Sequence, residues 1–213
     1  MATLLEGIGA HLQGDTLSRM SRQLGADEAT TKQAVSMALP MLLGGLAREA
    51  ETPQGAQSLD RALAEDHDGS VLDDLPSLFG AGTMGAADVA VPRALNGAGI
   101  LGHVLGGRRE PVQQGIGRAT GLDSQQVGRL LMMLAPLVMA YLGRRKREIG
   151  AGPAEISAHL QAERQQVEQQ MPGLGSLLGS LFGGGAAGED RPGFADDLAR
   201  LAPNVLGKLF GGR

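Results

Sequence analysis

The feature that most constrains the fold is an apolar helical segment that the chain carries twice. After Gly121 the sequence offers Asp123 as a helix N-cap, continues through thirteen uninterrupted apolar residues (130–142) and ends at a basic cluster (144–147). An earlier stretch repeats this pattern at an offset of 96 residues, with Gly25, Asp27, Met37 and Pro40 matching Gly121, Asp123, Met133 and Pro136. The sequence therefore predicts an all-α fold, a helical repeat built from two related units.

Composition fits a helical protein with an aliphatic core. The 213 residues include four Phe, one Tyr and no Trp, so Leu, Met, Val and Ala must fill the interior. The absence of Cys excludes disulfides and thiolate metal sites. The apolar run makes about 20 Å of helix, which is shorter than the roughly 30 Å of a bilayer core. We therefore expect a buried helix rather than a transmembrane segment. We also expect a cytoplasmic protein, because no classical signal peptide is visible.

Breaks in composition divide the chain into four parts. A first helical unit is expected at 1–65, and an acidic, then Gly- and Ala-rich link with short helical turns at 66–99. A second helical unit follows at 100–171, and a Gly-rich tail with a terminal amphipathic helix at 172–213. Pro40 falls inside the long helix of the first unit, where it is expected to kink or split that helix.

Several motifs resemble one bacterial family. GILGHVLGGRREPV (99–112) precedes ATGLDSQQVGRLLMMLAPLVMAYLG (119–143), and both follow ALPMLLGGLAREA (38–50) and the link DHDGSVLDDL (66–75). Together they are similar to the family known as domain of unknown function 937, related to YidB-like proteins, over about residues 1–165. The resemblance implies a small all-helical array and brings no established activity or catalytic residue.

The acidic link contains part of a calcium-loop pattern. Two of its aspartates fall at the third and fifth ligand positions, but Ala64 and Leu75 occupy the first and twelfth, where oxygen ligands are needed. The alternative is a turn in which Asp68 or Ser70 caps a short helix. This alternative is favoured, so no metal or cofactor is predicted, and the weak metal candidates are Asp66, Asp68 and Asp73.

Charge is distributed unevenly along the chain. Residues 49–92 carry a net charge of −8 and residues 93–147 a net charge of +7. The basic cluster comprises Arg144, Arg145, Lys146 and Arg147. Such a cluster can contact nucleic acid, complement the C-terminal end of its helix, or pair with the acidic part within one molecule or head to tail between neighbours. Nucleic-acid binding is the less favoured of these, since aromatic side chains for base stacking are scarce.

The sequence shows no catalytic constellation. Residues 97–102 match the Gly-x-Gly-x-x-Gly dinucleotide fingerprint, but that motif works only between a strand and a helix, and strand patterns are lacking. The four His are scattered without partners at helical spacing. We therefore expect a protein that is not an enzyme.

The tail contains the clearest functional lead. GSLFGG (179–184) recurs as GKLFGG (207–212), which places short apolar pairs between glycines. Such pairs suit docking into another copy or a partner protein, and the alternative is a tail that folds back on its own core. The sequence thus predicts an interaction or self-assembly (scaffold) protein, a homo-oligomer, whose apolar docking residues are Leu181, Phe182, Leu209 and Phe210.

Overall fold

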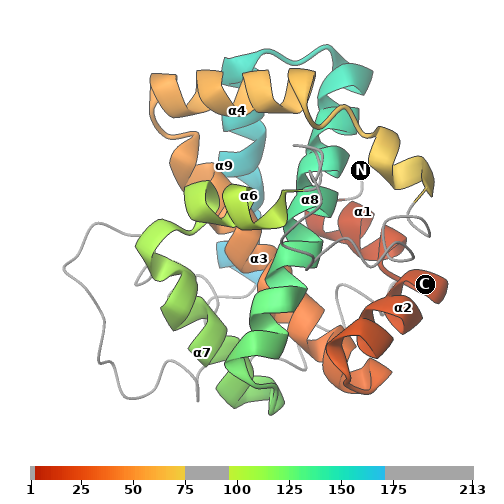
Figure 1. Ribbon diagram of the computed structural model, residues 1–213. Helices are drawn as coiled ribbons and strands as arrows, with labels where there is room; N and C mark the ends of the chain where they lie inside the picture. Colours follow the sequence, from red (N-terminus) through yellow and green to blue (C-terminus); the bar gives the residue numbers. More distant parts are fainter. Residues whose placement is uncertain (1–2, 75–95, 171–213) are drawn as a thin grey trace.

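The computed structural model describes residues 3–74 and 96–170, and in these ranges every regular element is a helix (Figure 1). The all-α prediction is confirmed. The α-helices are α1 (Leu4–His11), α2 (Asp15–Leu24), α3 (Glu28–Glu49), α4 (Pro53–Glu65), α6 (Gly97–Val104), α7 (Arg109–Thr120), α8 (Ser124–Ile149) and α9 (Pro153–Gln170). Two short 3-10 helices, η1 (Ser70–Asp74) and η3 (Gly106–Arg108), follow α4 and α6.

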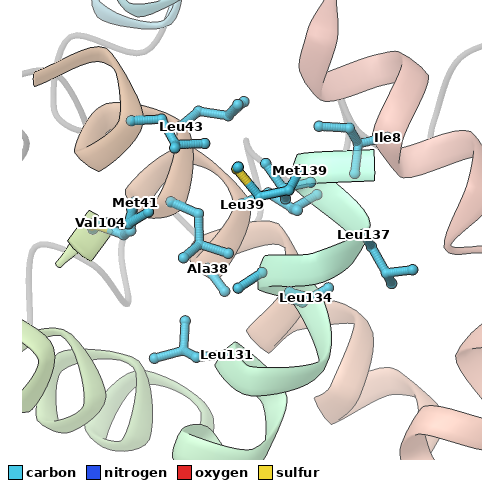
Figure 2. Packing of buried hydrophobic residues seen from close by; sticks show 14 of the residues in the cluster. Ile8, Ala38, Leu39, Met41, Leu43, Val104, Leu131, Leu134, Leu137 and Met139 are labelled. Carbon is cyan, nitrogen blue, oxygen red and sulfur yellow. The ribbon is translucent and has the colours of Figure 1, made fainter. Parts of the chain in front are cut away.

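The long helices α3 and α8 pack against each other at the centre, and the remaining helices surround them (Figure 1). Side chains of α3, such as Leu39, and of α8, such as Met139, gather in the core between them (Figure 2). Leu39 is fully buried and Met139 is only 4% exposed. Because both helices are apolar around most of their circumference, each can be stable only when other helices cover it on several sides.

The two long helices begin in the same way. Gly25 and Gly121 end the preceding helices in the left-handed conformation, with φ of 67° and 79°, which a glycine adopts without steric cost. Asp27 and Asp123 then cap α3 and α8, accepting hydrogen bonds from the backbone N–H of Thr30 and Gln126. These sequence features therefore have the predicted local roles. Descent of the two halves from one repeated unit stays a prediction.

Pro40 does not divide the first long helix. The sequence predicts a kink or a split there. The split is wrong, because α3 runs without a break from Glu28 to Glu49, and α8 likewise runs through Pro136, whereas the kink stays a prediction. A proline inside a helix costs about 3 kcal/mol, because it removes one N–H donor and crowds the carbonyl four residues earlier. Packing compensates for this cost, since both prolines are buried.

The carbonyl group affected by Pro136 belongs to Met132, and it lies against the start of α6. A β-carbon on Gly97 would overlap the Met132 carbonyl oxygen. Gly97 therefore lets α6 approach α8 closely at the point where a helical hydrogen bond is missing.

Within the described ranges, α8 is the one helix long and apolar enough to meet a length-and-composition test for a membrane span. Of its most apolar 18-residue window, 78% is buried inside the fold. The apolar residues of α8 are thus explained by packing inside the protein.

Candidate interaction surface

The basic cluster at the end of α8 faces acidic residues from the first half of the chain. Arg144 pairs with Asp73 and also donates a hydrogen bond from Nη2 to the backbone carbonyl oxygen of Gly69, at 2.9 Å. Lys146 Nζ lies 3.0 Å from Asp60 Oδ1 on α4. Asp60 on α4 and the residues Gly69 and Asp73 are thus joined to the C-terminal part of α8, far away in sequence. We call this contact between α4, η1 and α8 the seam.

The rest of the cluster is also engaged. Arg147 Nη1 lies 3.6 Å from Asp68 Oδ2, and Arg145 Nη1 lies 3.3 Å from Glu148 Oε2 within α8. Exposed ion pairs of this kind contribute about 0–1 kcal/mol each. Lys146 and Asp60 form the best shielded of the four pairs, with side chains 16% and 20% exposed. Three basic residues of the cluster therefore pair with acidic residues of the first half within one molecule.

Residues 66–74 form a capped turn on the surface of α8. Asp68 accepts a hydrogen bond of 2.9 Å from the backbone N–H of Ser70, which opens η1. Hydrogen bonds from Ser70, together with the nearby Arg147, hold the pKa of the Asp68 carboxyl below its usual value. This is the capping arrangement that the sequence offers as the alternative to a calcium loop.

The three weak metal candidates do not form a metal-binding group. In the part of the chain that the structure describes, no three His, Cys, Asp or Glu side chains converge as metal ligands. The carboxylates of Asp68 and Asp73 are instead directed at Arg147 and Arg144. These contacts favour a structural role for the 66–74 segment over a cation site.

Two glycines let the 66–74 segment lie close to α8. A β-carbon on Gly143 would overlap the carbonyl oxygen of His67, and one on Gly69 would lie 2.7 Å from Cβ of Arg144. His67 is buried, with 4% exposure, and this burial lowers the pKa of its imidazole. Sequence reasoning missed both glycine contacts. The available signal was Gly143, a helix-weakening residue between the apolar run and the basic cluster.

A second junction fixes α1 against α8 and α9. The hydroxyl of Tyr141 occupies the space that a β-carbon on Gly7 would need. The Tyr141 ring packs edge-on against the His11 ring, with 5.7 Å between the ring centroids. Glu163 of α9 is buried, and its Oε1 accepts a hydrogen bond of 3.1 Å from the backbone N–H of Leu5 in the first turn of α1. A carboxylate here satisfies an unpaired helix donor and complements the helix dipole. Burial raises the pKa of the Tyr141 phenol.

A polar pocket of about 330 Å³ lies between η3, α7 and the start of α8. Its polar side chains are one cation, one anion, two amides and a hydroxyl, and no His or Cys is among its lining residues. One amide contacts the anion at 3.4 Å, from Gln114 Nε2 to Glu110 Oε1. These polar lining residues are Arg109, Glu110, Gln113, Gln114 and Ser124. They include neither a general acid with a general base nor a nucleophile beside a base.

Comparison with known protein families places the chain in a bacterial family. The model of a family described as "Bacterial protein of unknown function (DUF937)" matches residues 6–145. The chain belongs to this family. No curated protein and no solved structure matches the chain.

The DUF937 match ends inside the basic cluster. It includes α1 from Glu6 onward, the helices from α2 to α7, the 66–74 segment and most of α8, whereas Lys146, Arg147 and α9 lie beyond it. Both sides of the Arg144–Asp73 pair are thus part of the DUF937 region. The predicted apolar docking residues Leu181, Phe182, Leu209 and Phe210 lie outside both the match and the residues that the structure describes.

Proposed function

We propose that this DUF937 protein is a non-enzymatic interaction protein that associates with further copies of itself through its tail, 172–213. In the described core, Ile149 is the one large hydrophobic side chain that is exposed, at 42%. The tail sequence adds two apolar pairs, Leu181–Phe182 and Leu209–Phe210, each followed by glycines. Short apolar anchors of this kind are unfavourable in water unless a surface receives them.

The internal ion pairs favour apolar rather than electrostatic association. A head-to-tail contact between the acidic and basic regions needs charges that are available to a neighbour. In this molecule Asp60, Asp68 and Asp73 already face basic residues of α8. A neighbouring copy would have to displace these pairs before it gained any of its own, so charge complementarity adds little to self-association.

The test is the molar mass of the full chain in solution. Light scattering after size exclusion compares the native sequence with a variant in which Leu181, Phe182, Leu209 and Phe210 are all replaced by Ser. A matched control carries Ser180→Ala and Lys208→Gln, which change neighbouring tail residues and keep the apolar pairs. We expect a multiple of the single-chain mass for the native chain and the control, and the single-chain mass for the Ser variant. A monomeric native chain, or an unchanged mass for the Ser variant, contradicts the proposal.

The same ion pairs argue against nucleic-acid binding through the cluster. A phosphate would have to replace the carboxylate partners of Arg144, Lys146 and Arg147. Substitution of all four residues of the cluster (144–147) by Gln is expected to leave retention on duplex DNA at low salt unchanged. A clear loss of retention in this variant would favour the nucleic-acid alternative.

A further inference from the structure

We propose that the two described halves, 3–74 and 96–170, are interlocked by reciprocal contacts, and that they exchange between two chains to form a dimer. The inference goes beyond the proposed association through the tail and adds a second contact between copies, in which each half packs against the complementary half of the other chain. Several of the reciprocal contacts involve positions of α3 and α8 that are 96 residues apart, the offset of the sequence repeat.

The first pair of equivalent positions is 45 and 141, in the C-terminal half of each long helix. A β-carbon on Gly45 of α3 would lie 2.6 Å from the carbonyl oxygen of Val104, the last residue of α6. Tyr141 of α8 covers Gly7 of α1. Each long helix thus receives, at the equivalent place, the short first helix of the other half.

The next positions on α3 receive α9 from the second half. Ser157 Oγ donates to the carbonyl oxygen of Ala50 at 2.7 Å, and Gln161 Nε2 donates to that of Ala47 at 2.8 Å. Both contacts lie at the C-terminal end of α3. The last helix of the second half is therefore fixed to the long helix of the first.

The equivalents of Ala47 and Ala50 on α8 are Gly143 and Lys146, and these receive α4 and the residues that follow it. Gly143 lies against the His67 carbonyl oxygen, and Lys146 pairs with Asp60 at 3.0 Å. The chemistry differs between the two sides, but the places of contact correspond.

A third reciprocal contact joins the N-terminal parts of the long helices, at Gln33 and Gln126, which are 93 rather than 96 residues apart. Gln33 Nε2 in α3 donates to the carbonyl oxygen of Ala119 at the end of α7, at 3.4 Å. Gln126 Nε2 in α8 donates to the carbonyl oxygen of Leu24 at the end of α2, at 2.9 Å. Each long helix therefore supports the last turn of the second helix in the other half.

These contacts give the fold an approximate two-fold relation, in which each half covers part of the long helix of the other half, while α2 also packs on α3, and α6 and α7 pack on α8, within their own halves. Residues 34–47 of α3 are all buried, and much of this burial comes from α6, α7, α8 and α9. The same contacts form whether the two halves belong to one chain or to two. Exchange therefore requires no new surface, and protein concentration decides how much exchanged dimer is present.

The ion pair between Glu51 and Arg164 allows a direct test. It joins the two halves at 2.6 Å, and its side chains are 47% and 29% exposed, so its loss perturbs the fold little. The chain has no native Cys. Two full-length variants, Glu51→Cys and Arg164→Cys, are mixed, unfolded, refolded together at increasing concentration and treated with a short thiol-to-thiol cross-linker. The doubly substituted chain, which reacts within itself, shows that the two thiols are within reach.

We expect a covalent two-chain product in the mixture that increases with concentration during refolding and exceeds the product from either single variant alone. Absence of this product at every concentration overturns the exchange. The same mixture is prepared with the four Ser substitutions in the tail. There, a cross-linked product supports exchange even if tail-mediated association fails. Assembly of the Cys mixture that keeps the native tail, without a cross-linked product, supports the tail and refutes exchange.

Discussion

The closest contact at the seam, between Gly143 and the 66–74 segment, gives the sharpest stability prediction. Replacement of Gly143 by Ala places a methyl group over the carbonyl oxygen of His67, 2.8 Å from its carbonyl carbon and 3.1 Å from the carbonyl oxygen of Leu63. Favourable contacts between such atoms begin at about 3.5 Å. Because the obstructing atoms are backbone, no side-chain rotation relieves the overlap, and the chain after α4 must move away from α8.

Two effects of opposite sign determine the size of the change. Overpacking of a closed site costs about 1–3 kcal/mol, near the upper end when backbone must move. Replacement of Gly by Ala in a helix returns up to about 1 kcal/mol. We expect Gly143→Ala to lower the free energy of unfolding by about 1–2 kcal/mol, which corresponds to a decrease in Tm of about 2–8 °C for a chain of this length.

Gly102→Ala is the matched control. Gly102 also lies in a helix, α6, but no heavy atom lies within 4 Å of the β-carbon position, so only the helix-propensity gain of up to about 1 kcal/mol remains. Urea unfolding followed by far-UV circular dichroism measures both variants. The two substitutions should shift the midpoint in opposite directions. A Gly143→Ala protein as stable as the native chain would refute the close approach of His67 to α8.

Three further predictions concern the caps, the buried histidine and the acidic loop. Asp123→Ala removes the N-cap of α8 and should cost about 1 kcal/mol in urea unfolding, and an unchanged midpoint would contradict the capping role. Burial lowers the pKa of His67, so below about pH 6.5 the unfolded chain binds a proton that the folded chain does not, and stability should fall as the pH decreases. His67→Gln should weaken this pH dependence, and an equal slope in both proteins would exclude His67 as its source. Calorimetric titration with Ca²⁺ should give no binding heat, whereas saturable heat that is lost in Asp68→Asn would restore the calcium interpretation.

The local helical signals were readable from the sequence. Asp27 and Asp123 each stand two residues after a glycine and before an apolar run, and both act as caps. The helix start and the helix end depend on neighbours within a few residues, so a single sequence contains them. The failure of Pro40 to break α3 has a tertiary cause, because burial on all sides outweighs a local preference.

The partners of the basic cluster were not readable in the same way. The sequence left open whether Arg144 and its neighbours pair within the molecule, with another copy or with nucleic acid. Asp73 lies 71 residues before Arg144, and only the packing of α4 and η1 against α8 brings the two together. Gly143 and Gly7 posed the same difficulty, because a glycine at a close helix contact looks in sequence like any other glycine in a Gly-rich chain.

The most direct test of the account is the molar mass of the full chain by light scattering at about 0.05 M and about 1 M salt, where the screening length falls from more than 10 Å to about 3 Å. Charges of α4, the 66–74 segment and α8 pair with one another within the molecule, and self-association is proposed to depend on apolar contacts. We therefore expect an assembly of the same mass at both salt concentrations. Dissociation to single chains at high salt, or single chains at both concentrations, would contradict the proposal.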